Sequence, residues 1–141
     1  MDETHAAAEL EELSHEECLE LLARHDFGRI AVLLDQHQPD IFPVNYRLDG
    51  ENIVFRSSTG TKLTHASLDR VAFEVDERDS SGGAWSVVVK GVAREITEAL
   101  DPVSVRERNL PIETPLSRGG DHFVRIVPRA VTGRRLVPPA T

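Results

Sequence analysis

The segment IFPVNYRLDGENIVFRS, residues 41–57, contains the clearest structural signal in this chain. In its first half every second residue is bulky, as in a β-strand with one buried face. These bulky residues are Phe42, Val44 and Tyr46. Asp49-Gly50 is a strong signal for a tight turn, and residues 53–57 supply a returning strand. The segment therefore predicts an antiparallel β-hairpin.

Further strands are predicted on both sides of this hairpin. Residues 29–34 are β-rich and apolar on both faces, and residues 71–76 alternate as a half-buried strand does. Residues 85–97 predict a long strand that is bent or bulged at Gly91, and residues 122–136 contain the last strand. Six mostly antiparallel strands at hairpin spacing, without a βαβ rhythm, favour a small β-barrel.

One amphipathic helix precedes the strands. Ser14 and Glu17 have the spacing of a capping box, and the leucines that follow at helical spacing predict a helix ending near residues 26–28. A short helical stretch is predicted at residues 62–67, and a turn or short helix at residues 98–108. The chain is therefore expected to be mainly β, with a leading helix and short connecting helices.

The charge of the chain is distributed unevenly. The formal net charge is −8, and the first 20 residues hold eight carboxylates with no lysine or arginine. Phosphate-backbone binding needs a basic surface, so we do not expect a nucleic-acid partner. Residues 1–12 are expected to be an acidic, disordered leader. Residues 13–141 are expected to form one domain, since a domain holds roughly 100–200 residues.

Residue types exclude several other classes of protein. Cys18 is the only cysteine, which excludes an internal disulfide framework and a cysteine-based zinc site. The six histidines have no metal-site spacing, so no metal site is predicted. The longest apolar run, Ile30–Leu34, is far shorter than the ~20 residues of a membrane span. With no secretory signal segment at the N-terminus, we expect a cytoplasmic protein without a membrane partner.

A polar segment after the hairpin has the composition of a phosphate-binding turn. The strand ends at Arg56, and hydroxyl residues, a glycine and Lys62 follow at the expected start of the short helix. Backbone N–H groups at a helix N-terminus bind phosphate, and hydroxyl, guanidinium and ammonium groups add donors. The upstream glycine of a Walker A loop is missing. A polar turn that only caps a helix would contain the same residues, so this segment alone leaves both interpretations open.

The strand before this turn adds a second feature. Pro43 has no N–H to donate, so residues 41–48 are expected to lie at a sheet edge or to carry a bulge. An open edge leaves the backbone groups of residues such as Val44 and Tyr46 available to the polar rim of a heterocycle. The turn and the open edge together predict a mononucleotide-cofactor site.

Five motifs, in this order and spacing, resemble the pyridoxamine 5'-phosphate oxidase-like family of flavin-binding split β-barrels. They are Gly28-Arg29-Ile30-Ala31, Phe42-Pro43-Val44-Asn45-Tyr46, Phe55-Arg56-Ser57 with Gly60-Thr61-Lys62, Phe73-Glu74-Val75-Asp76 and Trp85-Ser86-Val87-Val88-Val89-Lys90-Gly91. The resemblance extends from about Leu13 to Leu136 and fits the short uncharacterised or nitroreductase-like subgroup. It implies that residues 13–141 form a six-stranded antiparallel split barrel, and that two copies form a homodimer with FMN bound between the protomers.

The resemblance also implies roles for individual residues. The backbone that would line the isoalloxazine ring belongs to Val44, Asn45 and Tyr46. The phosphate would be held by Arg56, Ser57, Ser58, Thr61 and Lys62. The stretch that a second protomer contributes matches Trp85 and Ser86. Candidates for a positive group near the flavin ring are Lys90 and Arg47, and no catalytic side chain is assigned.

The implied function is that of an FMN-binding oxidoreductase acting on a small-molecule substrate. Pyridoxamine phosphate oxidases have an Arg-x-His substrate clamp near the C-terminus, and this chain lacks it, so vitamin B6 oxidation is not expected. Two alternatives stay open. One is an F420-dependent reductase, since F420 also presents an anionic phosphate to basic groups. The other is a non-enzymatic flavin-binding or flavin-sensing protein.

Overall fold

The computed structural model describes residues 7–35, 37–57, 70–113 and 122–139. This part of the chain contains seven strands and two helices, which confirms the mainly β fold. In chain order they are β1 (Glu9–Glu12), α1 (His15–Arg24), β2 (Phe27–Asp35), β3 (Gln38–Asp49), β4 (Asn52–Ser57), β5 (Val71–Arg78), β6 (Ala84–Glu95), α2 (Pro102–Glu107) and β7 (His122–Val137).

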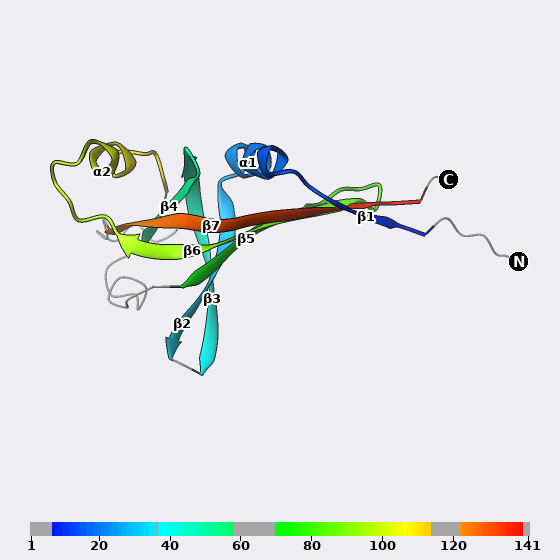
Figure 1. The fold of residues 1–141 in the computed structure, drawn as a ribbon, viewed down its shortest axis with the longest axis horizontal. Coiled ribbons are helices and arrows are strands. Elements are labelled where there is room, and N and C mark those ends of the chain that lie inside the picture. The colour runs from blue at the N-terminus through cyan, green and yellow to red at the C-terminus, as the bar shows by residue number, and fades with distance from the viewer. Residues whose placement is uncertain (1–6, 36, 58–69, 114–121, 140–141) are drawn as a thin grey trace, which may run out of the picture.

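The strands form one antiparallel sheet in the order β1-β7-β4-β3-β2-β5-β6. Because β6 also pairs with β7, six of the strands close into a ring, and β1 is an added strand alongside β7. The predicted split barrel is thus confirmed, with β1 as a seventh strand. Figure 1 shows both helices on one side of the long β6–β7 ribbon and the β2–β3 hairpin extending to the other side.

Helix α1 begins with the capping box that the sequence predicts. The Ser14 hydroxyl accepts a hydrogen bond from the Glu17 N–H at 3.1 Å, and the Glu17 carboxylate accepts one from the Ser14 N–H at 2.9 Å. These contacts satisfy backbone N–H groups that the start of a helix leaves unpaired. The helix buries Cys18, Leu21 and Leu22, so its apolar face covers the barrel interior.

Alternate residues of the strands fill the barrel. Tyr46 and Phe73 are both buried and meet edge to face, with ring centroids 4.9 Å apart. A smaller cluster lies on the other side of β4 and consists of Val54, Ile96, Ile112 and Phe123. Strand β4 is therefore buried on both faces, because Ile53 and Phe55 belong to the barrel core while Val54 belongs to the second cluster.

The pairing of β6 with β7 is bulged where the sequence predicts it. Lys90 pairs with Ala130, and the next residue, Gly91, pairs with Pro128, so Arg129 is an extra residue on β7. A β-carbon on Gly91 would lie 2.2 Å from a backbone oxygen of β7. Glycine is required here because the two backbones approach each other so closely.

The structure corrects the expected disordered leader. Residues 9–12 form β1 and pair with residues 134–137 of β7. Leu10 lies opposite Leu136, and the next two glutamates lie opposite two arginines. An apolar pair and opposite charges across two strands stabilise their pairing. The partners lie at the other end of the chain, so composition near the N-terminus does not reveal them.

Two further predictions concern the connections between strands. The turn or short helix expected at residues 98–108 contains α2. The helical stretch expected at residues 62–67 lies outside the described residues. Neither helix in the described part of the chain has the length and apolar character needed to cross a membrane.

Candidate functional site

The residues predicted to line a flavin ring lie on β3. Val44 and Tyr46 point into the barrel and are 7% and 1% exposed. The Tyr46 hydroxyl donates to the Leu22 carbonyl oxygen at 2.6 Å, and burial raises the Tyr46 pKa well above its usual value. Asn45 instead donates its side-chain amide to the Glu113 carbonyl oxygen at 3.0 Å. Val44 and Tyr46 can therefore offer only their backbone to a ligand outside the barrel.

One edge of β3 is open along its first half. Residues 38–45 pair with β2, whereas β4 pairs only with residues 46–49. Among the residues that the structure describes, no strand pairs with residues 38–45 on the side away from β2. Pro43 lies in this half, where its missing N–H costs no ladder hydrogen bond on the open side. The structure thus contains the open edge that the sequence predicts.

The predicted phosphate-binding turn is described only at its start. Arg56 and Ser57 are the last residues of β4, and Ser57 is 5% exposed. The Arg56 guanidinium lies over the Phe123 ring, 5.2 Å from its centroid. The other members of the turn, Ser58, Thr61 and Lys62, lie outside the described residues. Their assignment to a phosphate stays a prediction.

Three side chains of β3 and β4 hold the segment that follows α2. Asn45, Arg47 and Arg56 donate to the carbonyl oxygens of residues 113, 111 and 112, at 3.0, 3.2 and 2.9 Å. Together with Asp26 and residues 110–113 they surround a polar cavity of about 420 Å³. Sequence reasoning missed this role for Arg56, because its partner is a backbone oxygen of a distant loop, which no side-chain pattern reveals.

Trp85 and Ser86 lie near the start of β6, close to the end of α1. The Trp85 ring packs against the His25 ring, with 4.9 Å between centroids and an interplanar angle of 50°. Ser86 pairs with Asp76 of β5 and with Arg134 of β7. These contacts lie within one protomer. The predicted contribution of both residues to a second protomer's site stays a prediction.

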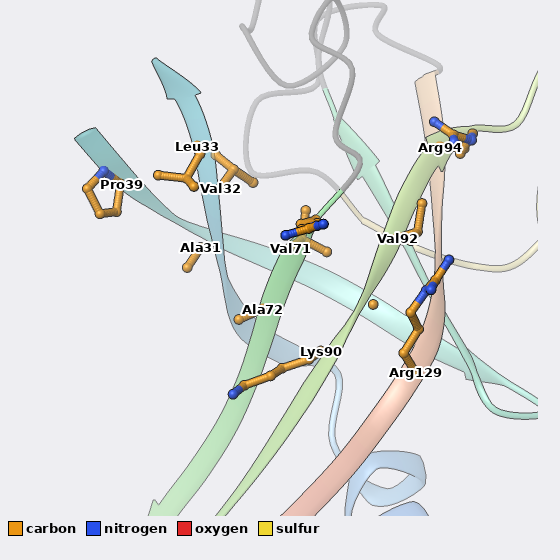
Figure 2. Close-up of a pocket in the computed structure, with 12 residues that line it drawn as sticks. Ala31, Val32, Leu33, Pro39, Val71, Ala72, Lys90, Val92, Arg94 and Arg129 are labelled. Atoms are coloured by element: carbon orange, nitrogen blue, oxygen red, sulfur yellow. The ribbon is translucent and has the colours of Figure 1, made fainter. Parts of the chain in front are cut away.

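A wide groove lies on the outer face of the barrel, over β2, β5 and β6 (Figure 2). Its volume of about 700 Å³ is typical of a small-molecule site. It is lined by Ala31, Val32, Leu33, Pro39, Arg70, Val71, Ala72, Lys90, Gly91, Val92, Arg94 and Arg129. Four of these residues are basic and none is acidic. The groove therefore combines an apolar floor with a positive rim.

Two lining residues of the outer-face groove come from, or directly follow, segments that the sequence singled out. Pro39 belongs to the open half of β3, and Arg70 is the first described residue after the phosphate-binding turn. Lys90, a candidate for the positive group near a flavin, lines the groove, whereas Arg47 lines the polar cavity. The lining comes from several separate strands, so no local sequence pattern predicts the groove.

A pair of carboxylates lies beside this groove. Glu74 and Asp76 share the face of β5 that also carries Ala72, because side chains two residues apart in a strand point the same way. Arg29 of β2 lies 3.4 Å from Glu74 and 3.7 Å from Asp76. Partial burial, followed by the hydrogen bond to Asp76 and its charge, raises the Glu74 pKa to about 7, although Arg29 opposes the rise. Glu74 therefore changes its charge near neutral pH.

The raised pKa of Glu74 predicts a pH-dependent stability. The folded chain keeps a proton on Glu74 where the unfolded chain has released it, so the free energy of unfolding falls as the pH rises from 4.5 to about 7. We expect Glu74→Gln to remove this part of the pH dependence, measured by urea unfolding between roughly pH 5 and pH 8. Glu77→Gln, at an exposed position of β5, is the control. A Glu74→Gln protein with the wild-type pH dependence would contradict the assignment.

A family model and a curated relative both match most of the chain. The model described as pyridoxamine 5'-phosphate oxidase matches residues 14–135. The uncharacterized protein Rv0080 of Mycobacterium tuberculosis is 34% identical over 139 residues, which cover 94% of this chain and 89% of that protein. The family model therefore covers every strand of the ring except the last two residues of β7.

Two solved structures share the fold and about a third of the aligned residues or slightly fewer. The FAD-binding protein of Mycobacterium smegmatis is 34% identical with a TM-score of 0.74, over 89% of this chain and 98% of that protein. An FAD-binding protein of Mesorhizobium loti is 27% identical with a TM-score of 0.75, over 92% of this chain and 98% of that protein. On its sequence and its barrel alike, the chain belongs to the pyridoxamine 5'-phosphate oxidase-like family.

Proposed function

We propose that this chain binds a flavin nucleotide, with FMN as the cofactor, and acts as an oxidoreductase on a small molecule. The observation that carries the proposal is the outer-face groove, which combines an apolar floor with a positive rim. A flavin nucleotide has matching parts, namely a flat ring system, a polar ring edge and an anionic phosphate. The two FAD-binding proteins of similar sequence support a flavin as the ligand.

The described residues fit such a ligand. Ala31, Ala72 and Val92 give the floor of the groove small apolar side chains against which a flat ring can pack (Figure 2). A bound flavin supplies the two-electron transfer chemistry, and the chain binds it, orients it and covers one of its faces.

We assign the phosphate to the turn that starts at Ser57. Among the described residues, the Ser57 hydroxyl and the Arg56 guanidinium at the start of the turn are the donors for this phosphate. Arg56 binds the Ile112 carbonyl oxygen in this structure, so a phosphate would compete with that contact. Ser58, Thr61 and Lys62 complete the assignment from the sequence.

Lys62 is expected to contribute strongly to phosphate affinity, because a phosphomonoester carries roughly two negative charges at neutral pH. Replacing Lys62 with glutamate is expected to weaken FMN binding by about 1–3 kcal/mol, the value of a hydrogen bond to a charged group. Riboflavin lacks the phosphate and is expected to bind both proteins nearly equally. Flavin fluorescence titrations measure both ligands. Wild-type FMN affinity in Lys62→Glu would show that the turn only caps a helix.

We further propose a homodimer with the cofactor between the protomers. The outer face leaves three large apolar side chains exposed, Phe27 at 48%, Leu33 at 55% and Ile41 at 67%. A second copy of the chain covers such a face most simply. Light scattering is expected to give about twice the chain mass of 15.6 kDa. A lone 15.6 kDa species at micromolar concentration would contradict the dimer.

Oxidoreductase activity is tested with the FMN-loaded protein. Oxidation of NADH or NADPH by the loaded protein, and none by the apoprotein, is the expected result. Flavin binding without turnover would instead support a flavin-binding or flavin-sensing role. Saturation by F420 in preference to FMN would support an F420-dependent reductase.

A further inference from the structure

The rim of the outer-face groove contains cations that no carboxylate neutralises. Arg70, Lys90 and Arg129 are exposed, and within the described ranges none of their side chains forms a hydrogen bond or an ion pair. Four other arginines, by contrast, lie within 3.6 Å of a carboxylate, namely Arg29, Arg106, Arg125 and Arg135. Uncompensated cations gathered over an apolar floor create a positive potential that attracts anions.

The bulge between β6 and β7 brings one of these cations into the groove. Arg129 is the extra residue of β7, next to Ala130, which pairs with Lys90. In a regular strand Arg129 would point to the face opposite Ala130, because neighbouring side chains alternate. The bulge interrupts this alternation, and both Lys90 and Arg129 line the groove. Figure 2 shows the Lys90 side chain reaching across β5 near Ala72, with Arg129 on the β7 side.

This pair of cations lies far from the start of the phosphate-binding turn. Ser57 pairs with His122 on β7, and Arg129 lies seven residues further along the same strand. At about 3.3 Å per residue, the two strand positions are on the order of 20 Å apart. A phosphate held near Ser57 is therefore out of reach of Lys90 and Arg129.

We propose that Lys90 and Arg129 bind a second anionic group, a phosphate or carboxylate other than the monophosphate of FMN. The proposal rests on flavin binding in the groove. Two sources share this chemistry: the adenylate half of a flavin dinucleotide, and the anionic group of a separate substrate. An anionic group from either source suits Lys90 and Arg129, because an ammonium and a guanidinium both donate charge-assisted hydrogen bonds to anionic oxygens.

The test compares two double variants. The groove variant carries Lys90→Gln and Arg129→Gln, and the control carries Arg24→Gln and Arg78→Gln, which remove the same charge from exposed positions outside the groove. Riboflavin, FMN and FAD are titrated by flavin fluorescence, and ADP is titrated by calorimetry into the FMN-loaded protein. Because both residues line the groove proposed for the flavin ring, any loss of affinity is expected to be the same for riboflavin and FMN, and smaller than about tenfold. The affinity of the groove variant for FAD, for ADP or for both is expected to fall by about tenfold or more. The control is expected to keep every affinity.

Each outcome separates the alternatives. A loss for FAD alone identifies the flavin dinucleotide as the source of the anion, and a loss for ADP on the loaded protein identifies a separate anionic molecule. An equal loss for FMN would show that the pair holds the only flavin phosphate, and unchanged FAD and ADP affinities would show that it holds no anion. Either of these results overturns the proposal.

Failure of flavin binding is distinguishable from failure of the anion site. A wild-type protein that binds no flavin would overturn the proposed function. ADP titrated into the protein as purified then tests the pair alone. Weaker ADP binding in the groove variant would still support an anion site, and equal or absent ADP binding in both proteins would overturn it.

Discussion

Replacing Gly91 with alanine is expected to lower the free energy of unfolding by about 3 kcal/mol or more, or to prevent folding. The added β-carbon would lie 2.2 Å from the Val127 carbonyl oxygen, 3.0 Å from its carbonyl carbon and 3.1 Å from the Pro128 α-carbon. These are backbone atoms of β7, so no side-chain rotation relieves the clash. The two strands would have to separate at the bulge, where β6 closes the ring.

Urea unfolding followed by the fluorescence of Trp85 measures the effect. Gly50→Ala is the control, because its φ of 62° introduces backbone strain while nothing lies within 4 Å of an added β-carbon. A loss of about 1–2 kcal/mol is expected for this control. If Gly91→Ala loses no more stability than Gly50→Ala, the close approach of β6 and β7 is wrong.

Replacing Glu107 with alanine is expected to cost about 3 kcal/mol, because removing one member of a buried ion pair leaves the other charge uncompensated. Glu107 is 0% exposed and accepts hydrogen bonds from Arg125 at 2.5 Å and from Asn52 at 3.2 Å. The Arg125 side chain is 24% exposed, so water offsets part of the loss. Burial and the hydrogen bond to Asp49 raise the Glu107 pKa, whereas Arg106 lowers that of Asp49.

Glu107→Gln is the matched variant, because an amide keeps the shape of the side chain and one oxygen acceptor. We expect it to lose clearly less stability than Glu107→Ala in urea unfolding. Equal losses in the two variants would contradict the role of the ion pair. The contacts of Glu107 also help to position the polar cavity. Glu107 is the last residue of α2, and residues 110–113, which follow it closely, form one wall of that cavity.

Local sequence signals predict the elements whose cause lies in adjacent residues. The hairpin at residues 41–57, the start of α1 and the bulge at Gly91 each depend on a few neighbouring side chains, and each is present in the structure. Strand β1 could not be predicted in this way. Its acidic residues pair with Arg134 and Arg135 at the far end of the chain, so the expected disorder was wrong for residues 9–12.

The backbone of the candidate site was more predictable than its side chains. Pro43 correctly indicated the open edge of β3, because a missing N–H is a local property. The contact of Arg56 with the Ile112 carbonyl oxygen depends on a loop whose position only the complete fold determines. The groove depends on several strands meeting, and Arg129 enters it through a bulge whose glycine lies on another strand.

Titration of FMN into the purified protein tests flavin binding without any assumption about the substrate. Flavin fluorescence and visible absorption are recorded as the protein concentration rises. We expect both signals to change and to saturate as a single class of sites, with the bound flavin remaining on the protein through gel filtration. Flavin signals that stay those of free FMN at every protein concentration would contradict the proposal that the outer-face groove is a flavin site.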